Sequence, residues 1–104
     1  MRIGAMKVNK RKLQDLCRKW RIVKLEVFGS VLRQDFHSES DVDLLVTFAP
    51  DTRWSLMQLY EAEQEFAALF GRQVELVPRS GIERSANYIR RRAILESAEV
   101  IYAA

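Results

Sequence analysis

The stretch "IVKLEVFGSVLRQDFHSESDVDLLVTF" (22–48) contains two segments that predict β-strands, separated by a polar loop. Residues 22–28 alternate between apolar and charged side chains and are rich in β-branched and aromatic residues, which is typical of a strand. Residues 41–48 are apolar on both faces after their start, which predicts a central strand. A glycine–serine pair ends the first strand, and two aspartates open the second.

Helical patterns flank these strands. A first helix is predicted after Asn9, which suits an N-cap, and its apolar residues recur at three- and four-residue spacing up to Trp20. A second begins with the capping box of Ser55 and Gln58 and ends at Gly71. Residues 72–78 predict a third strand, and helical spacing resumes from Ile82.

This order of elements predicts one α/β (α+β) domain spanning residues 1–104. We expect a small mixed sheet of three or more strands flanked by helices. We expect residues 1–8 to be either disordered or added in cloning.

The composition is that of an ordinary soluble domain, with 48% hydrophobic and 30% charged residues. No apolar run approaches the roughly 20 residues that span a bilayer, and the N-terminus lacks the apolar region of a signal peptide. The single cysteine, Cys17, cannot form an intrachain disulfide. We therefore expect a cytoplasmic protein without membrane contact. The net charge of +3 is compatible with nucleotides, RNA or an acidic partner, and equally with plain surface solvation.

Asp41 and Asp43 are the first candidates for chemistry. Residues i and i+2 of a strand point to one face, so both carboxylates can aim at one point. Two converging negative charges repel each other unless a cation lies between them, and Mg²⁺ suits oxygen ligands. A pair of such ions suits phosphoryl or nucleotidyl transfer. The alternative is an exposed strand start, where aspartate is common.

Gly29 and Ser30 favour the metal site. Glycine lets the backbone approach a ligand closely, and N–H groups at a helix start bind phosphate oxygens together with a serine hydroxyl. Ten residues separate Ser30 from Asp41. If the two strands are adjacent, a phosphate-binding turn therefore lies beside the aspartate pair.

Glu75 is a third candidate, because it lies between Val74 and Leu76 in the third predicted strand. A glutamate in that place either faces solvent or completes a site, and the alternation along a strand favours neither. If the third strand lies beside the second, Glu75 joins the aspartates as a metal ligand or general base.

The glycine–serine pair, the ten residues and the Asp-x-Asp pair ahead of an apolar strand resemble the minimal nucleotidyltransferase (MNT) family of the DNA polymerase beta-like superfamily. The resemblance covers residues 10–104 and is most specific at this motif. It implies the nucleotidyltransferase fold and a two-metal site. The implied Mg²⁺ ligands and catalytic residues are Asp41, Asp43 and Glu75, and the residues implied to bind the triphosphate of ATP are Gly29, Ser30 and Arg33.

The chain departs from the family pattern at two places. The usual third carboxylate is an aspartate, whereas Glu75 has one more methylene group. Arg33 is flanked by Leu32 and Gln34, where a small residue and a glycine are common in the family. These departures concern the third ligand and the loop over the nucleotide.

The resemblance also implies a partner and a reaction. Minimal enzymes of this family are typically paired with a helical HEPN protein, an RNase toxin, and they neutralise it by adding AMP to a tyrosine. The implied function is therefore that of an Mg²⁺-dependent protein adenylyltransferase, using ATP, that is the antitoxin of a toxin–antitoxin system. Homo- or hetero-oligomers are compatible with this role.

Two other functions remain open from the sequence. An MNT-fold antitoxin with weak or no catalysis would neutralise its partner by binding alone, as the departures at Glu75 and around Arg33 allow. A small RNA- or DNA-binding module would fit the basic charge, although no platform of basic and aromatic residues is evident. Residues 90–92, three arginines, either form a solvated helix face or contact a nucleic acid or an acidic partner.

Overall fold

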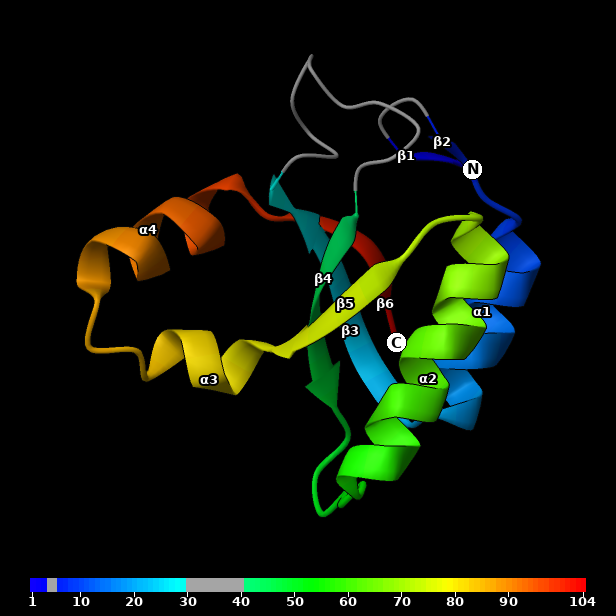
Figure 1. Ribbon diagram of the computed structural model, residues 1–104, viewed down its shortest axis with the longest axis horizontal. Helices are drawn as coiled ribbons and strands as arrows, with labels where there is room; N and C mark the ends of the chain where they lie inside the picture. The colour runs from blue at the N-terminus through cyan, green and yellow to red at the C-terminus, as the bar shows by residue number, and fades with distance from the viewer. Residues whose placement is uncertain (4–5, 30–40) are drawn as a thin grey trace.

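The computed structural model describes residues 1–3, 6–29 and 41–104. Its centre is a four-stranded mixed sheet (Figure 1), in which β4 and β5 are parallel and the other neighbouring strands are antiparallel. The α/β class and the mixed sheet predicted from the sequence are therefore confirmed. In spatial order the strands are β5 (Val74–Pro78), β4 (Val42–Phe48), β3 (Ile22–Phe28) and β6 (Glu99–Ala103).

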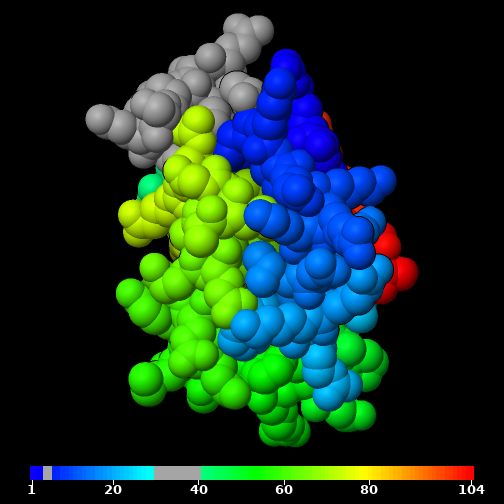
Figure 2. Space-filling model, turned by 90° about the vertical axis from the view of Figure 1, so that its right-hand side faces the viewer, coloured from blue at the N-terminus to red at the C-terminus, as the bar shows by residue number. Residues whose placement is uncertain are grey.

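Two helices, α1 (Lys10–Lys19) and α2 (Leu56–Phe70), cover one face of the sheet, and Figure 2 shows them side by side on that surface. The Asn9 side chain accepts a hydrogen bond from the Lys12 N–H at the start of α1. The capping box of Ser55 and Gln58 begins α2, as predicted. Apolar residues of both helices and of the sheet form the main core, including Leu13, Cys17, Leu25, Leu44 and Phe66.

The parallel pairing of β4 with β5 follows from α2. Parallel neighbours need a crossover connection, which is usually a helix, and α2 fills that role between the two strands. Gly71 ends the helix with a φ of 71°, a left-handed conformation that glycine adopts without strain. The chain then turns back to place β5 at the edge of the sheet, beside β4.

The helices α3 (Arg79–Glu83) and α4 (Tyr88–Ser97) lie on the other side of the sheet (Figure 1). The sequence predicted one helix from Ile82 onward, but the helix ends at Glu83 and a new one begins at Tyr88. Asn87 makes this break favourable, because its side chain caps α4 by accepting from the Arg90 N–H. A second, smaller cluster of Phe28, Leu45 and Ile82 fills this side, with Val77, Ile94, Leu95 and Ala98 packed around it.

Both ends of the chain contribute to the fold. The short strands β1 (Arg2–Ile3) and β2 (Met6–Lys7) pair antiparallel, and Ile3, Met6 and Val8 are buried in the main core. At the other end, "EVIYA" forms β6 on β3, a strand that was not predicted from the sequence. No helix within the described residues is long and apolar enough to cross a membrane.

Candidate functional site

The alternation along β4 decides which face of the sheet carries chemistry. Val42, Leu44 and Val46 point into the main core under α1 and α2, whereas Leu45 belongs to the cluster on the opposite face. Because neighbouring side chains of a strand point to opposite faces, Asp43 lies on the face of Leu45. Burial of Val42 and Leu44 thus fixes the strand, and the Asp43 carboxylate lies on the side of α3 and α4.

Glu75 lies directly beside Asp43, because the two residues are register partners in the parallel pair of β4 and β5. Adjacent strands are about 4.8 Å apart, and partners in such a pair point to the same face. Glu75 is exposed at the sheet edge, while its neighbour Val74 is buried in the core. β5, the third predicted strand, therefore lies beside β4, the second. This was the condition under which Glu75 could join the aspartates as a metal ligand or general base.

Gly29 lies against Asp43 from the other side. Its φ is 79°, and a β-carbon at this position would lie 2.7 Å from the Oδ2 oxygen of Asp43. Only glycine leaves room for the carboxylate there, since real Cβ atoms do not approach another atom so closely. The cross-strand partner of Asp43 is Phe28, so the end of β3 brings Gly29 next to the carboxylate.

The remaining predicted site residues are placed less completely. Asp41 is exposed immediately before β4. Ser30 and Arg33 lie outside the described residues. Within residues 1–3, 6–29 and 41–104, no three His, Cys, Asp or Glu side chains are close enough together to hold a metal ion. Asp41, Asp43 and Glu75 therefore do not form such a group.

The donor chemistry of these residues nevertheless fits Mg²⁺. All three side chains offer carboxylate oxygens, which this hard cation prefers. A bound cation would offset the repulsion between these like charges. The main chain at Gly29 lies close beside the Asp43 carboxylate.

A further acidic residue on this face, Glu26, was not predicted from the sequence as a candidate site residue. It lies on β3 two residues before Phe28 and is only 4% exposed. Its carboxylate accepts a 2.6 Å hydrogen bond from Nη1 of Arg79, and Nζ of Lys24 lies 3.9 Å away. Arg79 also pairs with Glu83 at 3.2 Å. The available signal was the glutamate between Leu25 and Val27, the same pattern that singled out Glu75.

The surroundings of Arg79 stabilise its charged form. Burial by itself lowers the pKa of the guanidinium, but the hydrogen bonds and negative charges of Glu26 and Glu83 outweigh this effect and raise the pKa. Arg79 follows the last residue of β5 directly. The ion pair therefore ties the end of the strand that carries Glu75 to β3, on the candidate face.

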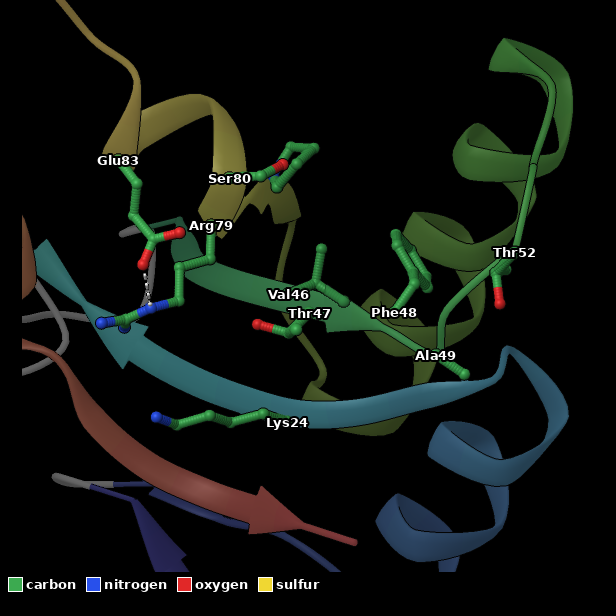
Figure 3. A pocket seen from close by; sticks show the side chains of 10 residues that line it. Lys24, Val46, Thr47, Phe48, Ala49, Thr52, Arg79, Ser80 and Glu83 are labelled. Carbon is green, nitrogen blue, oxygen red and sulfur yellow. Dashed lines mark hydrogen bonds and ion pairs between the residues drawn. The ribbon is translucent and has the colours of Figure 1, made fainter.

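A cavity of about 460 Å³ lies at the opposite end of β4 from Asp43, and its lining includes Lys24, Thr47, Arg79 and Ser80. Figure 3 shows Lys24 and Arg79 extending toward the end of β3 that leads to Gly29, with the Arg79–Glu83 ion pair dashed. The Thr47 hydroxyl is buried without a hydrogen-bond partner in the described part of the chain. The cavity does not contain the predicted carboxylates, so it is separate from the candidate site.

The chain is similar to known proteins of one family. The family model for the nucleotidyltransferase domain matches residues 10–100. Protein adenylyltransferase MntA of Thermococcus cleftensis is 34% identical over 70 residues, which are 67% of this chain and 69% of the relative. The family match includes β3, β4 and β5, the strands that carry or adjoin Gly29, Asp43 and Glu75.

Solved structures show the same fold. A crystal structure of a toxin–antitoxin with AMP-PNP has a TM-score of 0.68 at 21% identity, covering 93% of this chain and 75% of that chain. The complex of a tri-AMPylated Shewanella oneidensis HEPN toxin with an MNT antitoxin has a TM-score of 0.55 at 18% identity, covering 91% and 70%. At these identities the likeness concerns the arrangement of helices and strands.

Proposed function

We propose that this chain, which belongs to the nucleotidyltransferase domain family, transfers AMP from ATP to a tyrosine hydroxyl of a HEPN-type toxin and thereby acts as its antitoxin. The relatives support this reading, because one is a protein adenylyltransferase and another is an antitoxin bound to an AMPylated HEPN toxin. Within this chain, the observation that carries the proposal is the contact of Gly29 with Asp43, with Glu75 opposite Asp43 on the next strand.

In this proposal three carboxylates would hold the metal. Asp41, just before β4, and Asp43, on β4, would bind Mg²⁺ together with Glu75 of β5. Bound there, Mg²⁺ would neutralise the triphosphate and make the attacking hydroxyl more acidic. The longer side chain of Glu75 suits its place on the edge strand, because an exposed glutamate can rotate toward the ion from outside.

The triphosphate lies along the turn after β3. Gly29 lets the main chain approach the phosphates, and Ser30 and Arg33 donate hydrogen bonds to their oxygens. In the transfer, the tyrosine oxygen forms a bond to the α-phosphorus, and the bond from that phosphorus to the bridging oxygen breaks. Pyrophosphate leaves with the electron pair, and Glu75 accepts the hydroxyl proton as the general base.

A cytoplasmic location is part of the same proposal. The cytoplasm contains ATP, and its redox state keeps thiols reduced. The Cys17 thiol is fully buried, and this burial raises its pKa to about 12, so it remains an inert core group.

The proposal is tested by label transfer. The chain is incubated with ATP labelled at the α-phosphate, Mg²⁺ and its HEPN-type partner, and the label on the partner is measured. The expected result is transfer by the native chain and none by Asp41→Asn/Asp43→Asn, which keeps the side-chain shapes. Equal transfer by the double variant would contradict the proposal.

An antitoxin that acts by binding alone is the second candidate. It is favoured by the departure from the family pattern at the third carboxylate, where Glu75 replaces the usual aspartate. The two candidates differ in one outcome, the neutralisation of the toxin by Asp41→Asn/Asp43→Asn. If this variant still binds the toxin but no longer neutralises it, catalysis is required and the binding-only function is excluded.

A further inference from the structure

The ion pair of Glu26 with Arg79 crosses a strand of the sheet. The order of the strands is β5, β4, β3, and Arg79 directly follows β5 while Glu26 lies on β3. Neighbouring strands are about 4.8 Å apart, so the pair links two strands separated by roughly 10 Å. Leu45 of β4 is the register partner of both Glu26 and Val77 and is fully buried. Figure 3 shows the Arg79 side chain extending from α3 toward β3.

The pair restrains the strand that carries Glu75. β5 is the edge strand, and β4 is its neighbour in the sheet. Glu75 and Val77 are two residues apart on this strand and share a face, and Arg79 follows two residues later. An edge strand opens more readily than a central one, because fewer backbone hydrogen bonds hold it. The link from Arg79 to β3 therefore adds a restraint on the face where Glu75 lies.

Two other contacts of the same groups do not provide this link. Nζ of Lys24 lies 3.9 Å from Oε1 of Glu26, against 2.6 Å for Nη1 of Arg79. Lys24 and Glu26 are both on β3, so their contact joins no second strand. The exposed pair of Arg79 with Glu83 lies within α3. Of these three contacts, the one between Arg79 and Glu26 connects the end of β5 to β3.

Two charges are not needed in this place for stability alone. Glu26 is only 4% exposed, and the loss of hydration on burial offsets most of the attraction between buried charges. Apolar side chains of similar volume would stabilise the fold about equally well. A hydrogen bond of 2.6 Å differs from an apolar contact because it fixes the distance and the direction between its atoms. The ion pair is therefore suited to setting a position.

We propose that the ion pair of Glu26 with Arg79 holds Glu75 beside the carboxylate of Asp43, in the position that AMP transfer requires. This inference rests on the proposed function, in which Glu75 is a metal ligand and the general base. Glu26 and Arg79 act through Glu75 and are positioning residues. Groups that act on reacting atoms must be held within about 0.5 Å, and misplacement by roughly 1 Å costs about 10²-fold in rate.

The first test replaces both charges by apolar side chains. Glu26→Leu/Arg79→Met leaves no unpaired buried charge, so its stability in urea should be close to that of the native chain. We expect its kcat for AMP transfer to fall about tenfold, with an unchanged KM for ATP. Arg92→Ala, which breaks the exposed pair with Glu96, is the control for loss of an arginine and should change neither value. A native kcat in the double variant would overturn the proposal.

The second test asks whether the pair acts through Glu75. In a chain that carries Glu75→Gln, Glu26→Leu/Arg79→Met should cause no further fall in kcat, because the group that the pair positions is already lost. An equal fall with and without Glu75→Gln would show independent effects and would overturn the proposal. A raised KM for ATP at an unchanged kcat would also overturn it, since Arg79 would then act on the nucleotide.

Hydrogen exchange gives a readout that does not depend on activity. The amides of β5 should exchange faster in Glu26→Leu/Arg79→Met than in the native chain, whereas those of β3, which has a neighbour on each side, should not. Equal protection of β5 in the two chains would contradict the restraint. If β5 loses protection in the variant but the native chain transfers no label, the restraint on β5 stands and the proposed transfer fails.

Discussion

Gly29 and Asp43 are in such close contact that a single added carbon at position 29 would lie 2.7 Å from the carboxylate oxygen of Asp43. The two residues are fourteen positions apart in sequence, and the pairing of β3 with β4 brings them together. This contact links the predicted phosphate-binding turn to the predicted metal ligand.

The contact predicts a specific loss in Gly29→Ala. The methyl group would displace the Asp43 carboxylate and also strain a backbone with a φ of 79°, so we expect AMP transfer to fall at least tenfold. Gly71→Ala is the matched control. Its φ of 71° costs about 1 kcal/mol of stability in the same way, but a Cβ there meets nothing within 4 Å. A steady-state assay together with urea unfolding separates the two effects, and equal activity in both variants would contradict the prediction.

Glu75→Gln tests the third carboxylate. If Glu75 is a metal ligand and general base, the amide should lower transfer by roughly 10²-fold or more at saturating ATP, whereas unfolding should stay within about 0.5 kcal/mol because the side chain is exposed. Glu99→Gln removes an exposed carboxylate from β6 and should leave transfer unchanged. Native-like activity of Glu75→Gln would show that this residue faces solvent only.

The ion pair of Glu26 with Arg79 predicts a loss of stability. Removing one partner leaves a charge in a largely buried place, so Glu26→Ala should lower the free energy of unfolding by about 2–4 kcal/mol. Arg92→Ala breaks the exposed pair with Glu96 and should cost less than about 1 kcal/mol. Chemical unfolding at neutral pH gives both values, and similar losses in the two variants would contradict the buried role of Glu26.

Glu65 should make part of the free energy of unfolding depend on pH in the acid range. The hydrogen bond from Lys19 lowers the pKa of this carboxyl below 4.5; burial opposes the shift, and a hydrogen bond from Trp20 reinforces it. A group whose pKa is lower in the folded state stabilises the fold above its unfolded pKa and loses this contribution as the pH falls through the folded value. Glu65→Gln should therefore lose less stability than the native chain as the pH falls from about 5 into the acid range. Urea unfolding across this range measures it, and identical pH profiles would contradict it.

Several elements were predictable because their signals are local. The cap of Asn9 and the capping box of Ser55 each act within one helical turn, and both helices begin where these residues place them. The break before Tyr88 was not predicted, because the helical spacing of apolar residues continues through it. The side chain of Asn87 starts a new helix there by capping α4. The strand β6 was not predicted either, since a short apolar segment becomes a strand only when a partner such as β3 accepts its hydrogen bonds.

The same contrast holds for the candidate site. The residue types and their local placement can be read from the sequence: a glycine at the end of one strand, aspartates at the start of the next and a glutamate within a third. The folded chain is needed to place Asp43 between Gly29 and Glu75 and to pair Glu26 with Arg79. The physical reason is that strand order and register come from contacts between distant segments, through the crossover of α2 and the burial of Val42 and Leu44, which no local pattern encodes.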